Sequence, residues 1–82
     1  MNILVIDDDP AMTDLLKLLL RPTNSNVIAA HTGKDGLSII KQSMPDIVLL
    51  DLMMPEMDGW QVSKEIRTFS LVPILILYAL DS

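Results

Sequence analysis

The stretch ILVIDDDP, residues 3–10, decides how this chain folds. Its four aliphatic residues are too few for a helix and are followed at once by three aspartates, so residues 3–6 predict a short buried strand. Asp9 and Pro10 then suit the cap and the first position of a helix. A buried strand that runs into a capped helix indicates the start of an alternating α/β chain.

The remainder of the sequence repeats this alternation of short aliphatic runs and helix-periodic segments. Further strands are predicted at residues 27–30, 46–51 and 73–78, and helices at 10–21, 33–43 and from 58 or 59 onward. Because the strands show no alternation of apolar and polar residues, they are typical of a parallel sheet covered on both faces. We therefore expect an α/β fold in a single domain, residues 1–82, with the order βαβαβαβ. In the first helix, apolar side chains recur on one predicted face: Met12, Leu15, Leu16 and Leu19.

Composition excludes several classes of protein. The chain has 82 residues, half of them hydrophobic, no cysteine and a formal net charge of −5, so it lacks disulfides, thiolate metal sites and the basic footprint of a direct nucleic-acid partner. Its longest apolar run, residues 71–80, is ten residues long and contains Pro73, which is short of the roughly 20 residues needed to cross a membrane. A cytoplasmic protein without a membrane segment is expected.

Three aspartates at strand ends carry the chemistry. Asp7 and Asp8 follow the first strand and Asp51 ends the third, and the carboxyl ends of parallel strands lie at one edge of a sheet. If the first and third strands are neighbours, the three carboxylates share one small space. Carboxylates about 5 Å apart repel by roughly 3 kcal/mol at an effective dielectric of 20, so such a cluster calls for a cation. Oxygen ligands without cysteine suit magnesium or a similar divalent ion.

The same residues resemble the response-regulator receiver domains of two-component signalling. The matching motifs are ILVIDDDP at residues 3–10, PDIVLLDLMMPEMDG at 45–59 and VPILIL at 72–77, and the resemblance spans nearly the whole chain. It implies a flavodoxin-like three-layer fold with a parallel sheet of strand order 2-1-3-4. Because the sequence ends at Ser82, the family's fifth strand and last two helices are expected to be missing.

The resemblance also implies roles for individual residues. Asp51 would accept a phosphoryl group from a sensor histidine kinase, which makes the chain a phosphoacceptor rather than an enzyme. Asp8 and Asp51 would hold Mg²⁺ directly, the main-chain carbonyl of Met53 would be a third protein ligand, and Asp7 would act mostly through a coordinated water.

Two departures from the family leave the function open. Tyr78 stands where receivers place a Thr or Ser hydroxyl, and the lysine that follows the fifth strand has no counterpart. One reading is a phosphoacceptor that depends on Mg²⁺. The alternative is a dimerising interaction module, derived from a receiver, that is no longer phosphorylated. A phosphatase or phosphotransferase is disfavoured because Met53, not a second carboxylate, follows Asp51 at the required spacing.

The apolar segment at the end of the sequence predicts self-association. In the family the fourth strand lies inside the sheet, whereas here it is expected to form an edge. Most of the side chains from Leu71 to Leu80 are aliphatic, and an exposed apolar edge favours pairing with another strand. We therefore expect a homodimer through Leu71 to Leu80. Simpler roles are expected for Asp9 and Asp58, as helix caps, and for His31, as a surface loop residue.

Overall fold

The chain alternates strands and helices throughout residues 1–54 and 58–77, the part that the computed structural model describes. The strands are β1 (Asn2–Ile6), β2 (Asn26–Ala30), β3 (Ile47–Asp51) and β4 (Ile74–Leu77). The helices are α1 (Pro10–Leu20), α2 (Gly33–Ser43) and α3 (Gly59–Arg67), and a short 3-10 turn, Arg21–Thr23, follows α1. The predicted order is confirmed, and the observed boundaries fall within one residue of the predicted ones. Tyr78, the predicted last residue of the fourth strand, lies outside the described residues.

The four strands form one parallel sheet in the order β2-β1-β3-β4, as predicted. In the central register Ile6 of β1 lies opposite both Ala30 of β2 and Leu50 of β3. This register brings the ends of β1 and β3 to the same edge of the sheet. The residue that follows Ile6 and the residue that follows Leu50 are both aspartates.

Side-chain caps fix where each helix begins. The carboxylates of Asp9 and Asp58 and the hydroxyl of Thr32 each accept a hydrogen bond from a backbone N–H two or three residues further on, at 2.8–3.0 Å. Such a cap satisfies one of the N–H groups that the first turn leaves without a partner. The predicted capping roles of Asp9 and Asp58 are confirmed.

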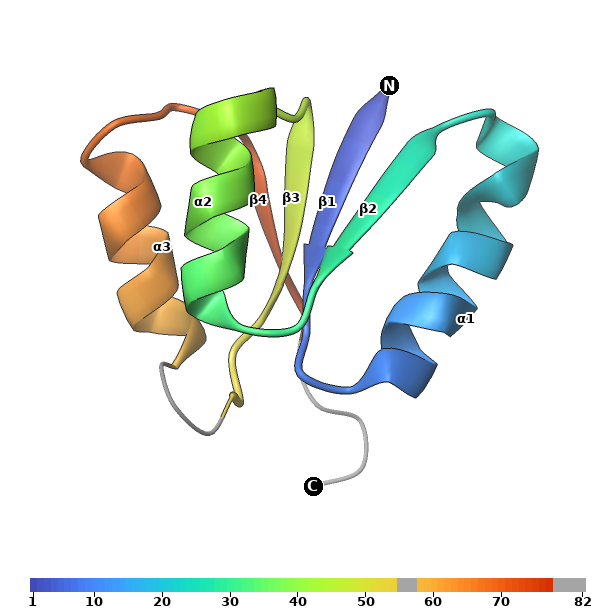
Figure 1. Ribbon diagram of the computed structural model, residues 1–82, viewed down its shortest axis with the longest axis horizontal. Helices are drawn as coiled ribbons and strands as arrows, with labels where there is room; N and C mark the ends of the chain where they lie inside the picture. Colours follow the sequence, from blue (N-terminus) through green and yellow to red (C-terminus); the bar gives the residue numbers. More distant parts are fainter. Residues whose placement is uncertain (55–57, 78–82) are drawn as a thin grey trace.

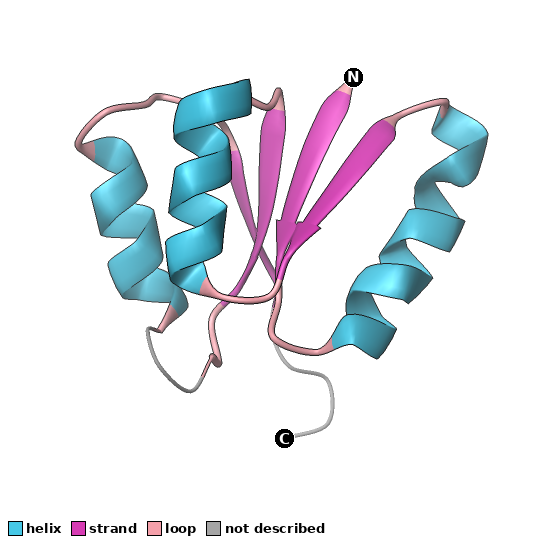
Figure 2. Ribbon diagram, in the orientation of Figure 1, coloured by secondary structure: helices cyan, strands magenta, loops and turns pink. Residues whose placement is uncertain are grey.

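Helices α2 and α3 cover one face of the sheet, and α1 covers the other (Figures 1 and 2). The face under α2 and α3 carries the larger core, whose buried side chains come from the sheet, from the turn after β3 and from these two helices. Its members are Leu4, Ile6, Ala30, Ile40, Val48, Leu50, Met54, Val62 and Ile66.

The face under α1 has a smaller core, made of Ile3, Val5 and Leu49 with the half-buried Leu16 and Leu20 of the helix. The predicted apolar face of this helix is therefore only partly right.

Two of its predicted members, Leu15 and Leu19, are 47% and 62% exposed. The reason is geometric: α1 has no helix beside it on this face of the described structure, so only a narrow strip of it contacts the sheet. The residue of α1 that is buried is Thr13, whose hydroxyl donates to the Pro10 carbonyl at 3.0 Å and lies 3.1 Å from Nε2 of His31.

Gly59 allows α3 to begin directly against the end of β3. A Cβ at this position would lie 2.5 Å from the Asp51 carbonyl oxygen and 2.6 Å from Cα of Leu52, both backbone atoms. The Gly59 N–H donates to the Leu52 carbonyl at 3.0 Å. The missing side chain thus lets a helix terminus touch the strand end that carries the third aspartate.

None of the helices in residues 1–54 and 58–77 has the length and apolar character needed to span a membrane.

Candidate metal and phosphoacceptor site

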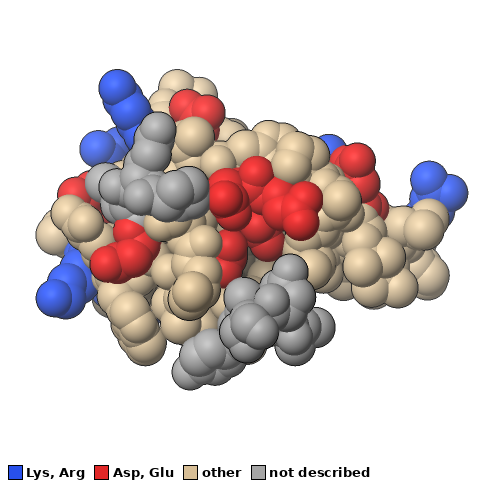
Figure 3. Space-filling model, turned by 90° about the horizontal axis from the view of Figure 1, so that it is seen from below, with Lys and Arg blue, Asp and Glu red and all other residues tan. Residues whose placement is uncertain are grey.

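The three predicted aspartates come together at one edge of the sheet. Asp7, Asp8 and Asp51 each offer a carboxylate oxygen, and these oxygens lie within 4.8 Å of one another. Figure 3 views the molecule from the side of this edge, and acidic side chains gather at the centre of the view. Two separate segments of the chain, the ends of β1 and β3, therefore supply one compact set of oxygen ligands.

Asp7 is buried and held from both sides. Its backbone N–H donates to the Ala30 carbonyl of β2 at 3.0 Å, which extends the β1–β2 ladder by one step. Its Oδ1 accepts the Asp9 N–H at 3.0 Å, and this bond closes the turn that leads into α1. The carboxylate is therefore fixed at the strand end.

Burial and the neighbouring carboxylates disfavour the ionised form of Asp7. Burial raises the pKa of the Asp7 carboxyl above its usual value, and the hydrogen bond from Asp9 partly counteracts this. The neighbouring charges of Asp51, Asp8 and Asp9 raise that pKa further. A site that disfavours its own ionised form is one that a divalent cation would stabilise.

Asp51 is the last residue of β3 and is also buried, whereas Asp8 is exposed. The Oδ1 of Asp51 accepts the Met53 N–H at 3.0 Å, so the turn after β3 orients the carboxylate. The Met53 side chain is exposed, which leaves only its main chain near the cluster. The set of hard oxygen donors fits a hard cation such as Mg²⁺.

Comparison with known proteins identifies the family of this chain. A family profile described as "Response regulator receiver domain" matches residues 3–82. The chain belongs to this family. Receiver domains act in two-component signalling, in which they are paired with sensor histidine kinases, so the resemblance drawn from the aspartate motifs is confirmed.

Two curated relatives of the receiver are both called "Probable transcriptional regulator ycf27". The protein from Porphyridium aerugineum is 46% identical over 80 residues, and the one from Guillardia theta is 41% identical over 79 residues. These alignments cover 98% and 96% of the present chain but only 33% and 31% of the relatives. The chain thus spans about a third of the length of each relative.

Solved receiver structures share the fold. The BeF3-activated N-terminal receiver domain of Klebsiella pneumoniae RstA superposes with a TM-score of 0.91 at 32% identity, covering 100% of this chain and 70% of that one. The N-terminal domain of a response regulator receiver protein from Methanoculleus marisnigri JR1 superposes with a TM-score of 0.87 at 36% identity, covering 92% and 63%. The flavodoxin-like receiver fold is therefore established for the described part of the chain.

Other residues that the sequence singles out have mixed outcomes. His31 is an exposed loop residue, as expected, but its ring contact with Thr13 was not predicted. Trp60, in the first turn of α3, is 58% exposed. Tyr78, at the position of the family's hydroxyl residue, lies outside the described residues.

Proposed function

We propose that this receiver accepts a phosphoryl group on Asp51 from the phosphohistidine of a sensor histidine kinase, with Mg²⁺ bound beside it. One observation carries the proposal: a buried strand-end carboxylate lies with two others inside a 4.8 Å cluster. The proposed ligands are the carboxylates of Asp8 and Asp51 and the main-chain carbonyl of Met53, and Asp7 is proposed to act through a coordinated water. The chain would accept a phosphoryl group in the cytoplasm and would not turn over a substrate as an enzyme.

The chain's own residues prepare Asp51 for attack. The Met53 N–H holds one carboxylate oxygen in place, and the paired strand fixes the backbone behind it. An oxygen of Asp51 forms the new bond to phosphorus while the phosphorus–nitrogen bond of the phosphohistidine breaks, and the bonding electron pair stays on the imidazole nitrogen. Bound Mg²⁺ would offset the negative charge that gathers on the phosphoryl oxygens. Asp7 and Asp8 hold the negative charge that attracts the cation.

Magnesium binding and phosphorylation can be tested in one experiment. The protein is titrated with MgCl2 while Trp60 fluorescence is followed, then acetyl phosphate is added and the intact mass is measured. We expect a saturable change in fluorescence and then the mass increase of one phosphoryl group. Asp51→Asn should remove the mass increase, whereas Asp35→Asn, which neutralises a carboxylate in the first turn of α2, should leave it intact. An unchanged adduct on Asp51→Asn would refute Asp51 as the acceptor.

The interaction module is the second candidate function. Binding of Mg²⁺ without an adduct from acetyl phosphate or phosphoramidate would select it over the phosphoacceptor. It is also compatible with the proposed homodimer, which the described part of β4 supports. In the part of the chain that the structure describes, β4 pairs with β3 alone. Leu75 of β4 is 54% exposed, and Leu71, which precedes the strand, is 91% exposed. We propose that a second copy pairs along this edge.

Sedimentation equilibrium tests the homodimer at micromolar concentration. We expect a dimer for the unaltered chain and a monomer for Leu75→Lys. The matched control is Leu15→Lys, because Leu15 is a similarly exposed leucine of α1 that lies away from β4. A folded monomer for the unaltered chain, with native circular dichroism, would overturn the dimer.

A further inference from the structure

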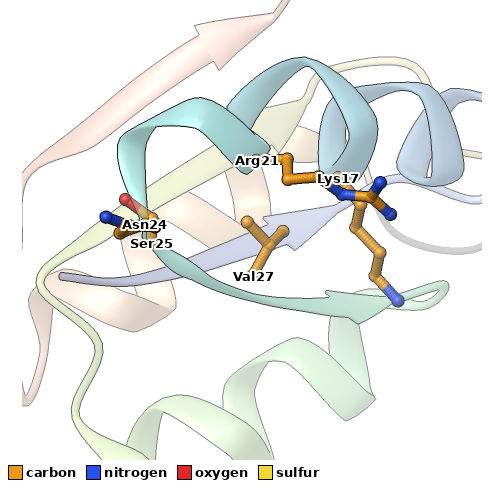
Figure 4. A pocket seen from close by; sticks show the side chains of 5 residues that line it. All are labelled: Lys17, Arg21, Asn24, Ser25 and Val27. Carbon is orange, nitrogen blue, oxygen red and sulfur yellow. The ribbon is translucent and has the colours of Figure 1, made fainter.

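A groove lies between α1 and strand β2, and its lining includes none of the residues of the phosphoacceptor site. It has a volume of about 430 Å³, within the range typical of ligand sites. Its lining residues are Lys17, Arg21, Asn24, Ser25 and Val27 (Figure 4). Two of the five are cations, which is unusual for a chain with 6 basic and 11 acidic residues.

The two cations converge on the groove from one helix surface. Lys17 and Arg21 are four residues apart, a spacing that places their side chains next to each other. Figure 4 shows both reaching into the space between α1 and β2. The other four basic residues are on the helices of the opposite face of the sheet: Lys34, Lys41, Lys64 and Arg67. On α1 itself Asp14 is the one carboxylate inside the helix.

Strand β2 forms the floor of the groove and is an edge of the described sheet. The Asn26 N–H and the Ala30 carbonyl both bond toward β1. Since the N–H and C=O of a strand residue point to the same side and this side alternates along the strand, Val27 and Ala29 direct their backbone groups away from β1. Their N–H and C=O groups therefore line the free edge.

Hydroxyl and amide groups at one end of the groove add polar contacts. The Thr23 hydroxyl lies 2.6 Å from the Leu20 carbonyl and 2.7 Å from the Ser25 oxygen. Because a carbonyl can only accept, the one hydroxyl hydrogen of Thr23 is directed to Leu20, and the Ser25 hydroxyl bonds to Thr23 as the donor. Asn24 is held in the left-handed region with φ 56°, which places its side chain at the turn before β2. The side-chain donors that line the groove are therefore those of Lys17, Arg21 and Asn24.

From these observations we propose that the groove binds an extended acidic peptide of a partner protein, which pairs with β2 as an added strand. Backbone groups of the peptide would bond to Val27 and Ala29, and acidic side chains at alternate positions would meet Lys17 and Arg21. Strand addition gives affinity through the main chain and specificity through alternate side chains. A small anion would use the two cations but neither the free edge nor most of the groove. The proposal does not depend on phosphorylation of Asp51.

The test uses the acetylated and amidated hexapeptide Glu-Val-Glu-Val-Glu-Val, with two matched controls: Lys-Val-Lys-Val-Lys-Val, which reverses the charge, and Glu-Pro-Glu-Pro-Glu-Pro, which keeps the three glutamates but cannot pair as a strand. Binding is followed by two-dimensional amide NMR of the isotope-labelled chain. We expect saturable shifts at Val27 and Ala29 and slower hydrogen exchange at these two amides, with Glu-Val-Glu-Val-Glu-Val only. The double variant Lys17→Gln, Arg21→Gln should weaken binding about 5- to 10-fold, in line with two exposed ion pairs, and leave Mg²⁺ binding unchanged.

Three results would overturn the proposal. No shift with the acidic peptide, or equal shifts with the proline-containing peptide, would exclude strand addition. The same shifts with inorganic phosphate would identify a simple anion site. Self-association of Lys17→Ala without any binding of the peptide would show that Lys17 only guards the edge, as lysines at sheet edges often do. Retention of Mg²⁺ binding by Asp8→Asn, with the peptide shifts intact, would count against the metal proposal alone.

Discussion

The two faces of the sheet differ in the size of the buried core that covers them. Under α2 and α3, nine buried side chains form one cluster, and six of them come from the strands or the turn after β3. Under α1, the buried cluster has three members, all on strands. The same sheet therefore carries a large buried core on one face and a small one on the other.

The difference shows that the strands do not decide by themselves how stable each side is. Leu49 and Leu50 are neighbours in β3 and point to opposite faces, yet both are buried. The helices differ more. Val62 and Ile66 of α3 are fully buried, whereas Leu15 and Leu19 of α1 face solvent. We expect most of the free energy of unfolding to reside on the side of α2 and α3.

The largest expected effect comes from opening a cavity on each side in turn. Leu50→Ala should lower the free energy of unfolding by about 3–5 kcal/mol, and Leu49→Ala by about 2–3 kcal/mol, because solvent and the loosely held α1 can fill the space left at Leu49. Urea unfolding followed by circular dichroism measures both. Leu50→Val and Leu49→Val provide the same comparison if an alanine variant fails to fold. Equal losses would show that the two faces are equally well packed.

A smaller effect is expected from adding a methyl group where a helix lies close to a strand. Gly59→Ala places Cβ against backbone atoms of Asp51 and Leu52, so α3 must move, at a cost of about 2–3 kcal/mol. Gly36→Ala meets only side-chain atoms of the buried Ile6, Cδ1 and Cγ1, which can give way more easily than backbone, and should cost about 1–2 kcal/mol. Thermal unfolding compares the two. A larger loss at Gly36 would contradict the view that backbone contact at Gly59 is the tighter one.

The acidic edge belongs to neither face and should affect stability independently of both. Because the pKa of Asp7 is raised in the folded state, the unfolded chain loses this proton first as pH rises. Stability of the metal-free protein therefore falls as pH increases from the ordinary aspartate pKa, 3.8, toward the raised value. Asp7→Asn should remove that fall and raise the free energy of unfolding at pH 7 by about 1 kcal/mol.

Urea titrations of the metal-free protein between pH 3 and pH 7 measure this effect of Asp7. Glu65→Gln, which neutralises an exposed carboxylate of α3, is the control for a general loss of negative charge. An Asp7→Asn variant that is less stable than the parent at pH 7 would mean that the carboxylates do not repel one another.

The smallest effect is expected at the exposed leucines of α1. Leu19→Gln should change the free energy of unfolding of the monomer by less than about 0.5 kcal/mol, because this side chain is already 62% exposed. Chemical unfolding at low protein concentration provides the measurement. A loss above 1 kcal/mol would reveal a cover over α1 that residues 1–54 and 58–77 do not show.

The sequence was a good guide to the strands and to the acidic cluster. Residues 47–50 are aliphatic without alternation, which is a local signal of a strand buried on both faces. Parallel strands end at one edge of a sheet, but the meeting of Asp7 with Asp51 also needs β1 and β3 to be neighbours, and that strand order came from the family resemblance. The ligand roles of Asp8 and of the Met53 carbonyl stay predictions.

Features that depend on distant neighbours were not predictable. Leu15 and Leu19 fit a helical apolar pattern, but their exposure depends on which helices lie beside α1. The contact of Thr13 with His31 joins residues 18 apart in sequence and leaves no local pattern. The one local indication of the groove beside β2 is the pair of cations at positions 17 and 21, four residues apart. This spacing indicates a binding surface only when β2 is known to be an edge strand.

The close approach of Gly59 to β3 has a mechanical consequence. With backbone meeting backbone at the Asp51 carbonyl, no compressible side chain separates the strand end from the first turn of α3. Packed protein interiors yield little to small displacements. A shift of a few tenths of an ångström in the main chain of Asp51 would therefore move α3 as a rigid body. Trp60 lies in the first turn of α3, so its fluorescence would report that movement.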